Sequence, residues 1–222
     1  MLLALLTACA AEPGADVTLE SSDQKASYGI GFNIGQGIVP VGDRVDLSAF
    51  AMGLRDALDE ADPAIPEEEL AEILRAFQMD LRQAQQEAMN AEAEQNQVAA
   101  DSFMQVNGER EGVTTTESGL QYEVVEAGDG PTPGPEDQVT LHYRGTLPDG
   151  TEFDSSHDNG EPATFGLGNM IPGFAEGLQL MSVGSTYRLF VPPELGYGTR
   201  ATGPIPANSA LTFEVELLEI VE

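Results

Sequence analysis

The spacing of apolar residues divides the chain into two parts that meet near residue 112. From Gln24 to about Asn107, apolar residues recur every three or four positions, as on one face of a helix. Beyond Ser118 they alternate with polar residues, as in half-buried strands. The pattern predicts an α+β protein in which an all-α domain precedes a twisted antiparallel sheet.

The first part begins with two short helices. The earlier one carries Tyr28, Ile30, Ile34 and Ile38, and its four glycines either weaken it or let another helix approach closely. These glycines are Gly29, Gly31, Gly35 and Gly37. Asp46 is a candidate N-cap for the second helix, because its side chain can accept from the first free backbone N–H groups. Apolar residues then follow at helical steps: Leu47, Phe50, Leu54, Ala57 and Leu58.

The third predicted helix is long. Pro66 suits a first helical position, and the three glutamates after it suit the positive end of the helix dipole. An apolar stripe follows at Leu70, Ile73, Leu74, Phe77 and Leu81. Residues 83–100 are mostly Ala, Gln, Glu and Asn, which favour a helix but give it a weak apolar face. We therefore expect a long, largely exposed helix that ends at Asn107-Gly108.

The second part predicts strands and one short helix. A turn at Pro148-Asp149-Gly150 separates two strands, and residues 172–180 are the helix candidate. Together they predict a sheet wrapped on one short helix. The alternating apolar runs are Leu120, Tyr122 and Val124; Val139, Leu141 and Tyr143; Tyr187, Leu189 and Val191; and Leu211, Phe213, Val215 and Leu217.

The charge of the chain excludes several classes of partner. It holds 38 acidic and 9 basic residues, for a net charge of −29, and Lys25 is its single lysine. Nucleic acid needs clustered cations, and an anionic membrane surface would repel this chain. The acidic residues form either a solvated coat that resists aggregation or an adaptation to high salt, which would screen their repulsion.

Cys9 is the single cysteine, so the folded part can form no internal disulfide. It ends the apolar run 1–9, and Leu6-Thr7-Ala8-Cys9 resembles a bacterial lipobox, in which a lipid is attached to the cysteine. The basic residues that usually precede such a run are absent. We expect residues 1–23 to be a lipoprotein-type signal and tether, with chance similarity as the alternative. An anchored protein would face the periplasm or the cell exterior, and the alanine after Cys9 indicates the outer membrane.

Familiar catalytic and cofactor motifs are missing from the sequence. Two histidines, His142 and His157, are too few for a zinc site, so we expect no metal and no cofactor. Ser155, Ser156, His157 and Asp158 are triad residue types, but as neighbours in sequence they predict a polar loop. The glycines around Tyr197 match neither a dinucleotide fingerprint nor a P-loop.

Apolar and aromatic residues at strand ends and in loops remain, several of them beside Gly or Pro. Each one alone is more often a core residue, but loops lie at the surface, so a group of aromatic residues there indicates a binding site. The group is Tyr143, Phe153, Met170, Ile171, Phe174, Tyr197, Ile205 and Phe213.

The motifs around these residues resemble the FKBP family of prolyl isomerases over about 105 residues, in five ordered blocks. The helical half is similar, less closely, to the dimerisation domain of the macrophage infectivity potentiator group and its periplasmic chaperone relatives. The blocks are VTLHYRG (139–145), GTEFDSS (150–156), MIPGF (170–174), VPPELGYG (191–198) and IPANS with LTFEVELL (205–218).

The resemblance implies a proline-binding pocket that contains these residues together with Asp154. By that resemblance Tyr143, Asp154 and Tyr197 are catalytic, and the substrate-binding residues are Phe153, Met170, Ile171, Phe174, Ile205 and Phe213. The pocket floor in this family is usually Trp, whereas here it is Phe174, which buries less area and lacks an indole donor. Ala163 replaces another position that is often aromatic and leaves the rim more open.

The sequence therefore predicts a peptidyl-prolyl cis-trans isomerase with chaperone activity that assists the folding of secreted or envelope proteins. We expect a tether (1–23), a helical dimerisation domain (24–112) that pairs through residues 24–107, and an isomerase domain (113–222). Its partners would be unfolded, proline-containing polypeptides, with a lipid anchor as its one link to a membrane. Two alternatives are a proline-binding module without turnover and a holdase chaperone that acts through the helical half.

Overall fold

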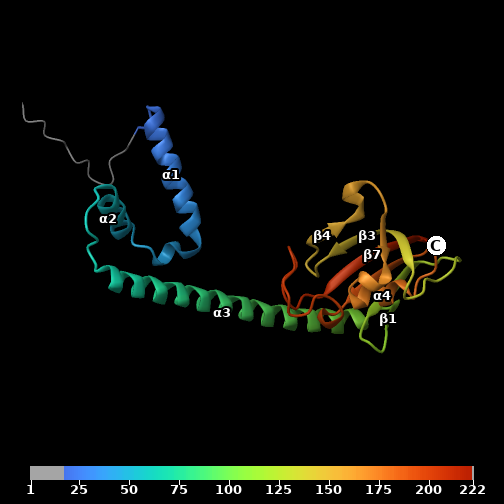
Figure 1. Ribbon diagram of the computed structural model, residues 1–222. Coiled ribbons are helices and arrows are strands. Elements are labelled where there is room, and N and C mark those ends of the chain that lie inside the picture. The colour runs from blue at the N-terminus through green and yellow to red at the C-terminus, as the bar shows by residue number, and fades with distance from the viewer. Residues whose placement is uncertain (1–17, 222) are drawn as a thin grey trace, which may run out of the picture. The chain divides into compact units, whose positions relative to one another are not determined.

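The computed structural model describes residues 18–221, and the chain forms two compact units that divide between Leu81 and Arg82. Helices make up the first unit, and the second combines helix with antiparallel sheet (Figure 1). This arrangement confirms the predicted α+β class. The predicted tether and Cys9 lie largely or wholly outside the described residues. No helix within residues 18–221 has the length and apolar content needed to cross a membrane.

The first unit contains α1 (Ser22–Ile38), a 3₁₀ turn η1 (Val39–Arg44), α2 (Leu47–Leu58) and the start of α3 (Glu67–Gly108). Asp46 is the N-cap of α2, as predicted, and accepts from the Ser48 N–H at 2.8 Å and the Ala49 N–H at 2.9 Å. Arg44 lies over the Phe77 ring at 4.7 Å and pairs with Asp80. These contacts hold η1 against the first turns of α3.

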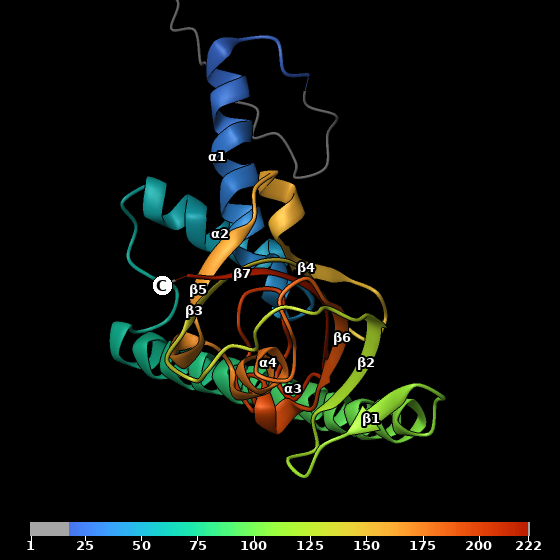
Figure 2. The ribbon, with the colours of Figure 1, turned by 90° about the vertical axis from the view of Figure 1, so that its right-hand side faces the viewer.

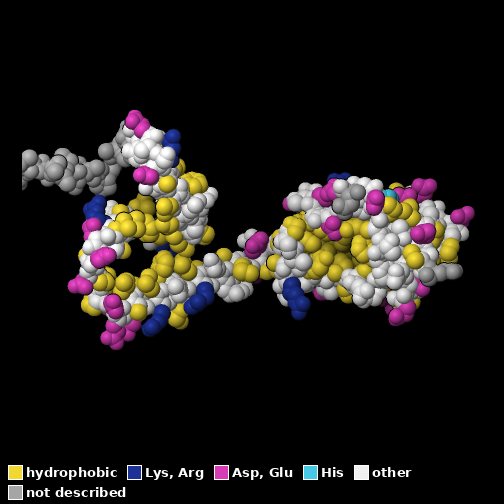
Figure 3. Space-filling model, turned by 45° about the horizontal axis from the view of Figure 1, so that its top comes forward, with side chains coloured by type: hydrophobic (Ala, Val, Ile, Leu, Met, Phe, Trp, Pro, Cys, Tyr) yellow, Lys and Arg dark blue, Asp and Glu magenta, His cyan; other side chains and the backbone are white. Residues whose placement is uncertain are grey.

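The helices of the first unit expose their apolar side chains. None of the residues of α1, η1 or α2 is buried, and Tyr28, Ile30 and Phe32 of α1 are each more than half exposed. Figure 3 shows hydrophobic side chains gathered on the surface of these helices. A Cβ placed on Gly29 or Gly35 of α1 would meet no atom within 4 Å among the described residues.

α3 continues into the second unit, where one stripe of it packs on the sheet domain. The stripe consists of Ala93, Asn96, Ala100, Phe103 and Asn107, at steps of three and four. Ala100 is 2% exposed, and the Phe103 ring lies 6.1 Å from that of Phe190. The remaining surface of this half of α3 is mainly exposed, as its composition predicts.

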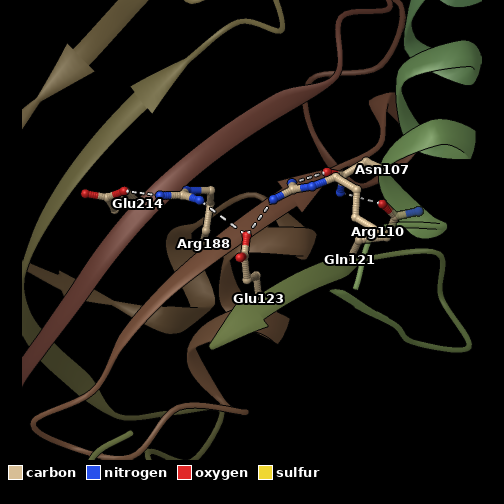
Figure 4. Close-up of polar contacts among 6 residues, drawn as sticks. All are labelled: Asn107, Arg110, Gln121, Glu123, Arg188 and Glu214. Atoms are coloured by element: carbon tan, nitrogen blue, oxygen red, sulfur yellow. Dashed lines mark hydrogen bonds and ion pairs between the residues drawn. The ribbon is translucent and has the colours of Figure 1, made fainter. Parts of the chain in front are cut away.

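The end of α3 is fastened to the sheet by polar contacts that Figure 4 shows in close-up. Asn107, 3% exposed, donates to the Gln121 side chain at 2.8 Å, and Gln121 donates to the Met104 carbonyl at 2.8 Å. Arg110 bridges Asn107 and Glu123, and Glu123 also pairs with Arg188. Because buried amides are costly when unpaired, these contacts make the last turns of α3 part of the sheet domain.

The sheet has the strand order β1-β2-β6-β7-β3-β4, and β5 also pairs with β3. All pairings are antiparallel. Figure 2 shows the strands curving around the short helix α4 (Pro172–Leu178). The strands are β1 (Val113–Thr115), β2 (Gln121–Glu126), β3 (Gln138–Thr146), β4 (Glu152–Ser155), β5 (Ala163–Gly166), β6 (Thr186–Val191) and β7 (Leu211–Val221).

The core of the second unit lies between α4 and the concave face of the sheet. Leu141, Leu178, Leu189 and Leu217 are completely buried there. Gly173 lets α4 approach the sheet closely, because a Cβ at this position would lie 2.6 Å from the Val191 Cγ1. This close approach fixes the depth at which the next residue, Phe174, enters the core.

Candidate active site

An open cavity of about 480 Å³ lies in the second unit, with aromatic rings on several sides. Seven of the nine predicted site residues line it, and four further residues complete its wall. The seven are Tyr143, Asp154, Met170, Ile171, Phe174, Tyr197 and Phe213, and the four are Thr164, Phe165, Gly166 and Asn169.

Phe174 is the most buried of the aromatic residues that line the cavity and forms its floor. It is 3% exposed, and its ring meets the Phe213 ring edge-on at 4.7 Å and the Tyr143 ring at 6.3 Å. Pro172 at the first turn of α4 and the close approach at Gly173 set its position. The rings therefore support one another in the edge-to-face geometry that aromatic pairs prefer.

Two of the predicted residues lie behind the cavity wall. Phe153 meets Phe213 edge-on at 5.6 Å and does not line the cavity. Gly145 makes room for it, since a Cβ there would lie 2.5 Å from the Phe153 ring. Ile205 is 5% exposed and lines a smaller hollow beside Met89 of α3. Phe153 therefore supports the Phe213 ring from behind, and Ile205 belongs to the hydrophobic core that also contains Phe174 and Phe213.

Tyr143 and Asp154 form the polar edge of the cavity. The Tyr143 hydroxyl donates to Asp154 Oδ2 at 2.6 Å. Burial, and after it this hydrogen bond to a carboxylate, raises the pKa of the Tyr143 hydroxyl above its ordinary value. Tyr143 therefore keeps its proton and holds the exposed Asp154 carboxylate in one orientation at the cavity mouth.

Tyr143 lies where the sheet divides. The first half of β3 pairs with β5 and its last residues pair with β4, which leaves His142 and Tyr143 between the two ladders. Ser156, 2% exposed, fills this gap: its Oγ accepts from the Tyr143 N–H at 3.0 Å and lies 3.0 Å from His142 Nδ1. The side chain of Ser156 thus replaces the missing strand beside Tyr143.

Two potential donors at the cavity have no internal partner. Among the described residues, neither the Ile171 N–H nor the Tyr197 hydroxyl makes a hydrogen bond. Tyr197 is 37% exposed and lies between Gly196 and Gly198. Both groups are therefore free to bind carbonyl oxygens of a peptide.

The remaining polar residues near the cavity offer no metal site. Within residues 18–221 no three His, Cys, Asp or Glu side chains come close enough to hold an ion. The two histidines stack at 4.7 Å, and Ser155 accepts from the His157 N–H as the cap of a 3₁₀ turn. The residues 155–158 thus form a polar turn, as predicted from their order in the sequence.

Ala163, the first residue of β5, was predicted at the rim of the pocket and is not among the residues that line the cavity, whereas the wall formed by the rest of β5 was not predicted. Phe165 meets Tyr143 edge-on at 5.8 Å, and Thr164 and Gly166 flank it. β5 spans four residues, too few for a clear alternation, and its pairing partner β3 lies more than twenty residues earlier. The one indication was Phe165 itself, an aromatic residue beside Gly166.

An apolar cavity with a carboxylate and free donors at its mouth suits an extended peptide with a ring-shaped side chain. Residues 130–218 match the family model described as FKBP-type peptidyl-prolyl cis-trans isomerase. Residues 23–124 match the model of the domain amino terminal to this isomerase. The chain belongs to the FKBP-type peptidyl-prolyl cis-trans isomerases.

The similarity to individual relatives covers most of the length of this isomerase. It is 39% identical to the outer membrane protein MIP of Legionella longbeachae, over 99% of this chain and 94% of the relative. It is 40% identical to the isomerase FkpA of Aeromonas hydrophila, over 90% of this chain and 77% of the relative. The crystal structure of FkpA from Escherichia coli superposes with a TM-score of 0.77 at 34% identity, covering 91% of this chain and 98% of that one.

Proposed function

We propose that this isomerase binds and twists the X-Pro bond in the aromatic cavity of the second unit. Rotation about a peptide bond has a barrier of roughly 20 kcal/mol because the planar amide is stabilised by resonance. The twisted amide has lost that resonance and much of its charge separation, so an apolar surrounding favours it over the planar form. The floor of edge-packed rings around Phe174 supports this proposal most directly.

Each residue at the cavity receives a role from its position. Phe174 and Phe213 hold the proline ring, with Phe153 and Ile205 as their support and Met170 at the side. The Ile171 N–H and the Tyr197 hydroxyl bind carbonyl oxygens of the substrate. Asp154, held by Tyr143, polarises the cavity mouth. No covalent intermediate is needed, because only a bond rotation is catalysed.

The roles of Asp154 and Tyr197 can be tested with a protease-coupled assay on a proline peptide. We expect Asp154→Ala and Tyr197→Phe each to lower kcat/KM about tenfold, the effect of one lost charge-assisted or well-placed hydrogen bond. Matched controls are Asp101→Ala, on an exposed face of α3, and Tyr122→Phe, whose ring stacks on Tyr187. Wild-type turnover in both site variants would refute the roles, whereas peptide binding with no turnover in the wild type would indicate a binding module.

We also propose that the first unit pairs with a second copy of itself. Its helices α1 and α2 bury no residue of their own, yet expose large apolar side chains such as Ile30 and Leu58. A unit of this size cannot offset its conformational entropy without a buried core. A second copy would supply that core, and the open glycine positions of α1 leave room for close helix contact.

Two isomerase sites in one dimer support a chaperone role toward unfolded envelope proteins. A client chain that binds one cavity meets the second at a high effective concentration. Suppression of aggregation by the full chain, compared with an isomerase that lacks residues 24–81 and keeps the second unit whole, tests this role. Equal suppression by both would refute it.

We propose a lipid anchor at Cys9 that places the protein in the periplasm or at the cell exterior, on the outer membrane. The lipobox-like residues 6–9 and the name of the Legionella relative support the proposal. Labelling with radioactive palmitate in a bacterial host tests it. Label in the wild type and none in Cys9→Ser is the expected result, and an unlabelled wild type would contradict it.

A further inference from the structure

The loop that carries Tyr197 is closed on itself by backbone hydrogen bonds. The Asn208 N–H donates to the Gly198 carbonyl at 2.7 Å, and Thr202 and Ile205 exchange two further bonds at 2.9 and 3.0 Å. The two ends of the loop 197–208 therefore move as one piece. Whatever holds Asn208 also determines where Gly198, and with it Tyr197, lies.

α3 holds this loop through a reciprocal pair of amide hydrogen bonds, which we call the Asn clip. Asn96 Nδ2 donates to the Ala207 carbonyl at 3.0 Å, and Asn208 Nδ2 donates to the Ala93 carbonyl at 3.1 Å. All four residues are half-buried. Asn208 has φ of 57°, a left-handed conformation that asparagine tolerates better than most residues.

Two hollows flank the Asn clip where α3 meets the loop. A hollow of about 240 Å³ lies on one side, between Met89 and Pro204, and one of about 210 Å³ lies on the other, between Ala99 and Pro148. Within the described chain, the two bonds of the clip are the hydrogen bonds that join α3 to residues 197–209.

We propose that Asn96 is a positioning residue of the isomerase site, which it reaches through the loop 197–208. It lies outside the cavity, on a helix that runs unbroken from Glu67 in the first unit. The inference rests on the proposed role of Tyr197 as a donor to the substrate. Once the clip is lost, the loop samples more positions and the Tyr197 hydroxyl meets the substrate less often.

The kinetic consequence is specific. A donor that binds planar and twisted peptide equally well contributes to KM rather than to kcat. We therefore expect Asn96→Ala to raise KM about fivefold, the effect of one net hydrogen bond, with little change in kcat. NMR exchange measurements on a proline peptide with the full-length protein separate the two constants.

A second variant removes the other half of the Asn clip without straining the backbone. Asn208→Gly keeps the left-handed φ and the N–H that binds Gly198, but deletes the bond to Ala93. It should raise KM as Asn96→Ala does, and the double variant should add little more. Asn90→Ala is the matched control, because this asparagine of α3 contacts Gln86 of its own helix instead. If Asn96→Ala fails to fold, the KM of Asn208→Gly tests the inference in its place.

A direct readout of the loop completes the test. Backbone amide resonances of Tyr197 and Gly198 should shift or broaden in both clip variants and remain unchanged in Asn90→Ala. Wild-type KM or unshifted loop resonances in the clip variants would overturn the inference, as would an equal rise of KM in Asn90→Ala. If Tyr197→Phe also leaves the kinetics unchanged, the proposed role of Tyr197 falls with it; if Tyr197→Phe raises KM, only the role of Asn96 is refuted.

Discussion

Replacing either of two buried serines in the second unit with alanine should affect the stability of the protein, but not in the same direction. Ser156 Oγ accepts a hydrogen bond from the Tyr143 N–H, so Ser156→Ala leaves this donor without a partner. We therefore expect a loss of about 1–3 kcal/mol of stability together with lower turnover. Ser185 is 1% exposed, and its hydroxyl has no partner among the described residues. Ser185→Ala should therefore be neutral or stabilising. Urea unfolding of both variants checks this, and equal losses would contradict it.

The raised pKa of the Tyr143 hydroxyl predicts that the protein loses stability at high pH. The folded protein raises the pKa of this hydroxyl above 10.0, so above that pH the unfolded chain releases a proton that the folded state keeps. Stability from this group is complete below pH 10 and falls as the pH rises further. Urea unfolding across this range should show a steeper decline in the wild type than in Tyr143→Phe. The pKa of Tyr187 is also raised, but both proteins share that group, so parallel curves would refute the prediction for Tyr143.

The sequence predicted those cavity residues that belong to motifs shared with the FKBP family. Phe174 and Tyr197 are examples, because each stands in such a motif beside a glycine, and both line the cavity. Phe165 and Ser156 were not predicted, since their roles come from pairing across β3 and from a gap between two ladders. Asn96 belongs to this second class, as its partner lies 111 residues away.

At the scale of elements, the end of α3 behaves as part of the sheet domain. A fragment 113–222, the predicted isomerase domain, lacks Asn107, Ala100 and Phe103. It would leave the Gln121 amide unpaired and expose part of Phe190. We expect it to be about 2–5 kcal/mol less stable than a fragment 82–222, from one unpaired buried amide and one uncovered ring. Denaturant unfolding compares them, and equal midpoints would show that α3 adds nothing.

The long elements were predictable because each carries its own start signal and period. Asp46 caps α2, the glutamates after Pro66 begin α3, and the alternation of β3, β6 and β7 shows in the sequence. The turn at 148–150 predicted a strand on the side where β4 lies, whereas the short strands β1 and β5 were not predicted, because three or four residues give no period. These short strands form because the longer strands leave free edges with which they can pair.

At the scale of the whole molecule, the two units differ in how far their large apolar side chains are buried. In the second unit the large apolar side chains are mostly buried between α4 and the sheet, and the ring-lined cavity opens among them. In the first unit they are mostly exposed on α1 and α2. A chain with net charge −29 repels its own copies, so pairing through the first unit requires this apolar surface to outweigh the repulsion.

Phe32→Glu should therefore convert a dimer to a monomer. Phe32 is 53% exposed on α1 and stacks on Tyr28, and a carboxylate there would be desolvated between two copies. Light scattering should give twice the chain mass for the wild type and a single mass for the variant, while Val98→Glu, an equally drastic change at an exposed site of α3, should stay dimeric. Turnover of a short proline peptide per chain should survive in the monomer, because the cavity lies entirely in the second unit. Assistance to a refolding protein should fall, since a client bound at one site no longer has a second site at high effective concentration. A wild type that is already monomeric would leave the exposed surface of α1 and α2 to a different partner and would overturn the proposed pairing.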